Sequence, residues 1–153
     1  MPVAVAMHWA MQSMLYADPT ERRFRLALDL LLTLLLGPTL AVWLPGPPAW
    51  LLALLAAHTL NFFFNGHLVA LCKDFGLVRH TYEQYRRYVE GFEARAGREP
   101  AIQQIELRGG LTRQSWSPYS DLDVRLVRRP GLINGLRACW FLLRERSHAL
   151  FAW

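Results

Sequence analysis

Two long apolar runs in the N-terminal half of the chain predict a pair of helices. The first run covers residues 26–44 and the second covers residues 50–71. A helix rises about 1.5 Å per residue, so about 20 apolar residues cross the hydrocarbon core of a bilayer. Both runs have about this length. We therefore expect two transmembrane helices.

The start of the first helix and the turn between the two runs are both marked in the sequence. Asp18 fits an N-cap, Pro19 the first helical position and Glu21 the third. Residues 44–48 read LPGPP, which ends a helix and leaves only a tight connection. The two helices should form an antiparallel transmembrane hairpin over residues 21–72.

The charges around this hairpin predict its orientation. The turn is uncharged and is flanked by Trp43 and Trp50, and tryptophan is enriched at membrane interfaces. Basic residues flank the other end: Arg22, Arg23, Arg25, Lys73, Arg79, Arg86 and Arg87. Because positive charge stays on the cytoplasmic side, we expect an integral protein of the cell membrane with both termini in the cytoplasm.

A buried helical hairpin in a soluble protein is the alternative interpretation of these runs. Two consecutive runs with so few charges, in a chain that is 53% hydrophobic, favour the membrane. Residues 1–20 lack a basic leader followed by a cleavage site, so they do not resemble a signal peptide. They are expected to form a short helix at the membrane interface, with a flexible tail as the alternative.

Polar residues interrupt both apolar runs. Asp29 lies one helical turn beyond Arg25, which predicts an ion pair or snorkelling toward the interface. The second run carries a polar stripe at spacings of three and four residues: His58, Asn61 and Asn65. This stripe should face protein and form hydrogen bonds between helices, with another subunit as the expected partner. A proton path, a metal site or a lipid headgroup site that includes His67 is the alternative.

An amphipathic helix is predicted in the connecting segment, residues 73–100. Thr81 and Gln84 fit a capping box, and Gly97 and Pro100 end the helical pattern. Apolar positions recur at helical spacing between them: Tyr82, Tyr85, Val89 and Phe92. Arginines this close to a membrane usually contact lipid headgroups, and the chain has no RNA or DNA motif. A nucleic-acid partner is therefore not expected.

Two short strands are predicted in residues 101–153. The first covers residues 101–107, and the second covers residues 122–127, next to Asp121 and Asp123. The period of two places these aspartates on the same face, about 7 Å apart along the strand. Two neighbouring carboxylates are suited to Mg²⁺, and glycines before them would let backbone amides approach a phosphate. These are the parts of a site for metal-assisted phosphoryl or nucleotidyl transfer.

The same residues resemble the signature of the DNA-polymerase-beta-like nucleotidyltransferase superfamily. Its members carry Gly-Gly or Gly-Ser followed by a hydrophobic strand with Asp-x-Asp. Small members often show Gly-Ser-x-Ala-Arg and Ser-Asp-Leu-Asp, and residues 109–113 (GGLTR) and 120–123 (SDLD) look similar. The resemblance covers about residues 81–153, and its specific part is residues 108–126. It implies a small α/β domain over residues 101–153 and does not extend to the hairpin. We therefore expect an α+β chain in which this domain, trimmed at its C-terminus, follows the hairpin.

The resemblance also implies roles for individual residues. The catalytic pair Asp121 and Asp123 would bind Mg²⁺. The nucleotide-binding residues would be Gly109, Gly110, Arg113 and Ser120, with Ser120 as an accessory group. The substrate would be an NTP, and the acceptor would be unknown and associated with the membrane. An acidic hairpin edge that faces solvent would give the same Asp-x-Asp string.

One part of the superfamily pattern is missing. Members usually carry a third carboxylate on a later strand, whereas here a helix over residues 131–146 is followed by residues 148–153, the start of a further strand. Glu106 is the nearby substitute, and Glu145 is expected on a helix surface beside arginines. Three functions therefore stay open: a membrane-anchored nucleotidyltransferase, a catalytically degenerate nucleotide- or partner-binding subunit, and a membrane assembly subunit that lacks this chemistry.

Overall fold

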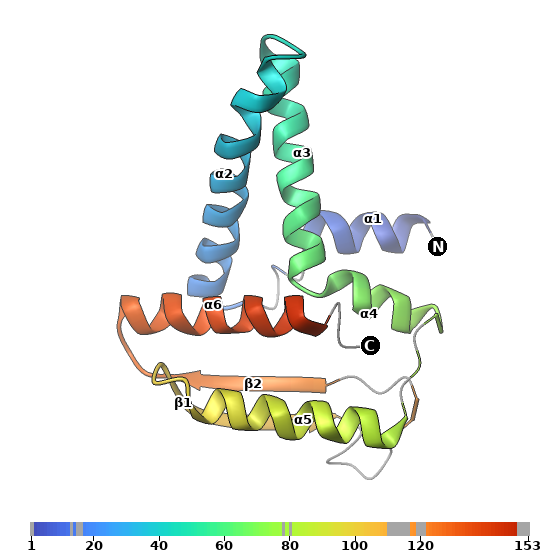
Figure 1. The fold of residues 1–153 in the computed structure, drawn as a ribbon, viewed down its shortest axis with the longest axis vertical. Helices are drawn as coiled ribbons and strands as arrows, with labels where there is room; N and C mark the ends of the chain where they lie inside the picture. Colours follow the sequence, from blue (N-terminus) through green and yellow to red (C-terminus); the bar gives the residue numbers. More distant parts are fainter. Residues whose placement is uncertain are drawn as a thin grey trace. The chain divides into compact units, whose positions relative to one another are not determined.

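The chain has a mixed α and β fold. The computed structural model describes residues 2–12, 14, 17–77, 79, 81–109, 117–118 and 122–149. These residues contain six helices and one two-stranded sheet (Figure 1). They divide into two compact units, Met1–His67 and Leu68–Trp153. An α+β chain with two apolar helices near the N-terminus is confirmed.

The N-terminal unit is built around a helical hairpin. It contains α1 (Pro2–Met11), α2 (Pro19–Ala41) and α3 (Pro47–Phe64). Helices α2 and α3 lie side by side and are joined by a short turn (Figure 1). Asp18 caps α2 as predicted, because its Oδ1 accepts hydrogen bonds from the backbone N–H groups of Thr20 and Glu21.

Small residues lie inside this hairpin and leucines lie outside. Ala49, Ala53 and Ala57 follow one face of α3 at helical spacing and are fully buried. Gly37 of α2 lies so close to the Trp50 ring that an added Cβ would be 2.3 Å from it. Small side chains allow two helices to approach closely. The leucines stay exposed on both helices: Leu30, Leu31, Leu34, Leu35, Leu51, Leu52, Leu54 and Leu55.

The second apolar run differs from its prediction because it forms two helices. Helix α3 ends at Phe64, and α4 (His67–Asp74) begins after a two-residue turn. Gly66 has φ of 76°, a conformation that glycine adopts without strain. The Asn61 carbonyl near the helix end accepts from both the backbone N–H and the side-chain amide of Asn65. One continuous helix over residues 50–71 is therefore excluded.

The C-terminal unit contains the predicted capped helix and the predicted strands. Helix α5 (Tyr82–Gly97) begins with a complete capping box from Thr81 and Gln84. Strands β1 (Ile102–Gly109) and β2 (Leu122–Arg128) pair antiparallel, and α6 (Leu132–Ala149) follows. Because α6 includes residues 148 and 149, a strand that begins at His148 is wrong. Residues 150–153 lie outside the described residues.

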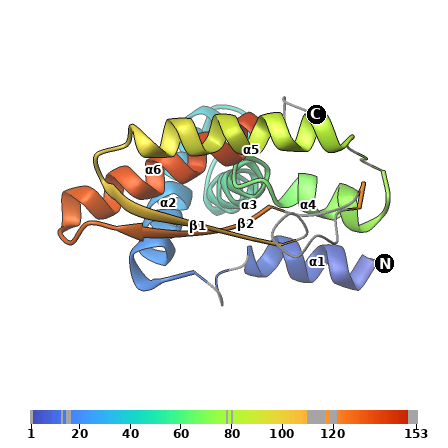
Figure 2. The same cartoon turned by 90° about the horizontal axis from the view of Figure 1, so that it is seen from below.

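One face of the strand pair forms the core of this unit. The register places Leu107 opposite Val124 and Ile105 opposite Leu126, with a bulge between Ile102 and Gln104. These four apolar side chains pack against residues of both neighbouring helices and of β1: Phe92, Ala96, Ile102 and Phe141. Helices α5 and α6 therefore cover the apolar face of the strands (Figure 2). This packing holds the strand pair in place against α5 and α6.

Candidate functional site

The strand register brings the two parts of the sequence motif to one end of the sheet. Gly109 at the end of β1 pairs with Leu122 at the start of β2, and Arg108 pairs with Asp123. In an antiparallel pair, the last residue of one strand lies beside the first residue of the next. Gly109 and Asp123, one residue from each part of the motif, therefore lie at the same end of the strand pair.

Four of the six residues predicted for the nucleotidyltransferase site lie outside the described residues: Gly110, Arg113, Ser120 and Asp121. For Gly109 and Asp123 the structure places only the backbone. Among the described side chains, no three of the types His, Cys, Asp and Glu gather closely enough to hold a metal ion. The Mg²⁺ site at Asp121 and Asp123 stays a prediction.

The two carboxylates considered as substitutes for the third acid both face arginines. Glu106 Oε2 of β1 lies 3.6 Å from Arg125 Nη1 of β2, its partner in the register. Glu145 of α6 binds Arg95 of α5 in a bidentate pair, with both nitrogen–oxygen distances 2.7 Å. Glu145 is only 5% exposed, so its predicted place on the helix surface is wrong. Its arginine partner belongs to a different helix, not to its neighbours along α6.

Two side chains in the cluster around Arg95 and Glu145 have raised pKa values: Arg95 itself and Tyr88. The hydrogen bond from Arg95 to Glu145 raises the pKa of the Arg95 guanidinium. Burial, and then the charge of Glu145, raises the pKa of Tyr88 to about 12. The Tyr88 hydroxyl donates to the backbone carbonyl of Glu145 at 3.4 Å. This cluster ties α5 to α6, which is a structural role.

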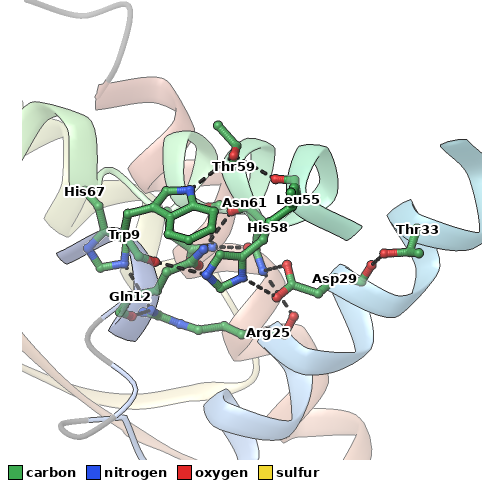
Figure 3. A network of polar contacts seen from close by, with 11 residues as sticks. Trp9, Gln12, Arg25, Asp29, Thr33, Leu55, His58, Thr59, Asn61 and His67 are labelled. Carbon is green, nitrogen blue, oxygen red and sulfur yellow. Dashed lines mark hydrogen bonds and ion pairs between the residues drawn. The ribbon is translucent and has the colours of Figure 1, made fainter. Parts of the chain in front are cut away.

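A second candidate site lies inside the N-terminal unit, where the polar stripe meets α2 (Figure 3). Asp29 Oδ2 lies 2.8 Å from His58 Nδ1, and Asp29 Oδ1 accepts from Asn61 Nδ2 at 2.7 Å. The Asn65 amide donates to the side-chain oxygen of Asn61. The predicted stripe thus joins helices by hydrogen bonds. Its partner is α2 of the same chain, however, where another subunit was expected.

His58 also connects the hairpin to α1. Its Nε2 lies 3.0 Å from the backbone carbonyl of Trp9, and its ring meets the Trp9 ring edge to face at 4.8 Å. A carbonyl only accepts, so Nε2 carries a proton. The other ring nitrogen, Nδ1, faces Asp29, so His58 bridges α1 and α2.

Further contacts complete the docking of α1. Gln12 is fully buried and its side-chain amide donates to the His58 carbonyl at 2.7 Å. The Trp9 indole N–H donates to the Thr59 hydroxyl at 3.1 Å. Residues 2–11 do form the predicted short helix, but these partners on α3 were not foreseen. The apolar pattern of α1 gives no signal for them, because the contacts use one indole and one amide.

Arg25 has different partners from those expected. Its Nη2 binds Glu21 at 2.7 Å, and its Nη1 contacts the Gln12 carbonyl and lies 3.1 Å from His67 Nε2. An arginine only donates, so this His67 nitrogen accepts and the ring is neutral. The expected ion pair between Arg25 and Asp29 is wrong, because Asp29 takes its partners from α3.

No protein-family model, no curated protein and no solved structure matches this chain. Arguments about its function therefore start from its own residues and geometry.

Proposed function

We propose that this chain is a membrane-anchored, nucleotidyltransferase-like protein that transfers a nucleotidyl group from an NTP to an acceptor associated with the membrane. The observation that carries the proposal is the pairing of Gly109 with Leu122. This register brings the backbone that would bind phosphate next to the strand start that would bind Mg²⁺. The helices packed on the opposite face would hold that end of the sheet in place.

The proposed reaction follows from the chemistry of two carboxylates and a bound cation. Asp121 and Asp123 would hold Mg²⁺, which neutralises charge on the triphosphate. A hydroxyl oxygen of the acceptor would attack the α-phosphorus, and the bond to the β-phosphate oxygen would break. Pyrophosphate would leave, and the hydroxyl proton would pass to a base. The backbone at Gly109 and Gly110 would orient the phosphates for this attack.

The distribution of side chains on α2 and α3 supports the membrane anchor. Both helices are long and apolar enough to span a bilayer by length and composition. Alanines lie between the helices and leucines cover the outside, which suits a hydrocarbon surrounding. Trp43 follows the end of α2 and Trp50 lies in the first turn of α3, and indole rings near a helix end anchor it at the interface. A water-soluble hairpin would bury its leucines instead.

A catalytically degenerate protein that binds nucleotide is the second candidate. One observation favours it: Glu106 and Glu145, the substitutes considered for the third carboxylate, each face an arginine. Without a third carboxylate, two aspartates would bind Mg-nucleotide but would leave the acceptor hydroxyl unactivated. A pure assembly subunit has less support, because the polar stripe is already paired within the chain.

Label transfer from each nucleoside triphosphate tests the proposal. Detergent-purified protein with added membranes is compared with Asp121→Asn and Asp123→Asn, and with Glu90→Gln, an exposed carboxylate on α5, as the matched control. We expect Mg²⁺-dependent transfer that falls at least about 100-fold in both aspartate variants and is unchanged in the control. Magnesium-dependent binding without transfer supports the degenerate protein. Neither transfer nor binding would overturn both candidates.

Cysteine labelling in intact cells tests the anchor and its orientation. Single cysteines are placed at Gly46 in the turn and at Arg86 on α5, with Cys72 and Cys139 changed to alanine. A membrane-impermeant reagent should label position 46 directly and position 86 only after permeabilisation. Labelling of position 86 in intact cells contradicts the orientation. Release of the protein from membranes by alkaline carbonate contradicts the anchor itself.

A further inference from the structure

Helix α6 exposes a row of large apolar side chains near its N-terminal end. Leu132 and Ile133 are each 74% exposed, Leu136 is 45% exposed and Trp140 is 55% exposed. Leu132, Leu136 and Trp140 are spaced by four residues, so they follow one face of the helix, with Ile133 beside them. This set of four side chains is called the α6 apolar face below.

The rest of α6 is already used for packing within the unit. Its buried residues include Gly135, Ala138, Cys139 and Phe141, and Phe141 belongs to the core under the strands. The helix therefore has one face for the domain and another that nothing in the described part of the chain covers. A contiguous exposed apolar face of this kind usually marks a contact with a protein or a membrane.

The charges around the α6 apolar face indicate what covers it. Three exposed arginines lie near it in the sequence: Arg129 before α6, Arg137 four residues after Ile133, and Arg144 four residues after Trp140. Arg137 also contacts Glu99, which lies between α5 and β1, with 3.1 Å between Nε and Oε1. Glu145 is the one acid within α6, and it is buried against Arg95. The exposed side of α6 thus combines apolar and basic side chains and has no acidic ones.

We propose that the α6 apolar face docks into the headgroup region of an anionic lipid bilayer. A helix with apolar side chains on one face and arginines along its borders lies in the plane of such an interface. The leucine and isoleucine side chains would enter the acyl boundary, and the Trp140 ring would lie at headgroup level. The arginines would contact lipid phosphates, because guanidinium groups form paired hydrogen bonds with phosphate oxygens.

This inference rests on the proposed membrane anchor, because the hairpin keeps the C-terminal unit within reach of a bilayer. Tethering raises the effective concentration of a binding surface, so even weak insertion would be populated. Docking through α6 would orient the strand pair with respect to the membrane and so present a membrane-bound acceptor to it. The role of α6 is then to position the unit, and it takes no part in the proposed chemistry.

Nitroxide accessibility in nanodiscs tests the docking. The full chain, with Cys72 and Cys139 changed to alanine, carries a spin label at Ile133→Cys or Leu136→Cys, or at Arg86→Cys as an exposed control on α5. The discs contain phosphatidylcholine with or without phosphatidylglycerol. In anionic discs, labels at 133 and 136 should collide more often with oxygen, which concentrates in the bilayer, than with a water-soluble nickel complex. The control label should collide more often with the nickel complex. Zwitterionic discs or high salt should reduce this difference.

Two results would overturn the inference. If labels at 133 and 136 are as accessible to the nickel complex as the control label, the α6 apolar face lies in water. Labels shielded from both reagents show that protein covers the face, and spin–spin broadening would identify a second copy of the chain.

Wild-type protein provides a check that needs no cysteine. Brominated lipids should quench Trp140 fluorescence, measured as the difference between wild type and Trp140→Phe, and an absence of this difference contradicts docking. Retention of the chain in the discs is scored separately, so failure of α6 docking is distinguishable from failure of the anchor. Label transfer from NTP is likewise measured independently.

Discussion

His58 Nδ1 of α3 lies 2.8 Å from Asp29 Oδ2 of α2, and this contact joins the two apolar helices of the N-terminal unit. The other oxygen of Asp29 accepts from Asn61, so both oxygens of this carboxyl group are used. A polar group in an apolar surrounding is costly unless its hydrogen bonds are made. Asp29 is therefore tolerated within its apolar run because α3 supplies a polar partner for each of its two oxygens.

Replacement of Asp29 by alanine should destabilise the N-terminal unit by about 3–5 kcal/mol, because His58 and Asn61 would lose their shared partner. Unfolding in mixed micelles, followed by tryptophan fluorescence, measures the change. Thr33→Ala is the matched control on the same helix, since its hydroxyl bonds only the backbone carbonyl of Asp29. Equal effects of the two substitutions would show that the pair adds little to stability.

The close approach of Gly37 to Trp50 gives a second prediction. A Cβ at Gly37 would lie 2.3 to 2.8 Å from three atoms of the indole ring, so Gly37→Ala must displace the ring. We expect a loss of about 1–3 kcal/mol in stability and a shift in Trp50 emission.

Gly97→Ala serves as the control for this substitution. Nothing lies within 4 Å of a Cβ at Gly97, so that change should be neutral or slightly stabilising. A well-tolerated Gly37→Ala with unchanged emission would contradict the close helix contact.

Local patterns in the sequence predict much of this fold. The Asp18 cap, the Thr81 capping box and the two short strands depend on neighbouring residues, and all are confirmed. The turn at Gly66 was missed because apolar stretches, residues 62–64 and 68–72, lie before and after it, so the run looks like one continuous helix. The end of α6 was missed for a similar reason, since residues 147–149 fit either a helix or a strand.

Partners across the fold were harder to predict. The stripe of His58, Asn61 and Asn65 was recognised, but its partner was not, although Asp29 and Asn61 lie about equally far from the turn between the helices. That near-equal spacing in an antiparallel hairpin places the two residues opposite each other. Glu145 was misplaced because its partner Arg95 belongs to another helix. Sequence periodicity gives the face of a residue but not what packs on that face.

The buried pair of Arg95 and Glu145 yields a third prediction. Glu145→Ala should cost about 2 kcal/mol, less than for a fully buried pair because Arg95 is partly exposed to solvent. Glu90→Ala is the matched control, since it removes an exposed pair with Arg86 at the similar distance of 2.8 Å and should change little. Thermal unfolding followed by circular dichroism compares them. An equal, small effect of both would contradict a structural role for Glu145.

Tyr88 gives a prediction for alkaline pH. Burial and the nearby Glu145 raise the pKa of Tyr88 from 10.0 to about 12. Below the pKa of the unfolded state the ring is neutral in both states, so its contribution to stability is fully present. Between about pH 10 and 12 the unfolded state releases its proton first, so stability falls as pH rises.

The difference between wild type and Tyr88→Phe isolates this effect from other groups that titrate at high pH. Denaturation midpoints measured across this range should fall more steeply for wild type than for Tyr88→Phe. The absorbance of tyrosinate gives an independent readout, because Tyr88→Phe should remove the absorbance of a tyrosine that ionises near pH 12. If Tyr88→Phe instead removes a group that titrates near pH 10, the ring is in contact with water and α5 and α6 pack less closely than the structure shows.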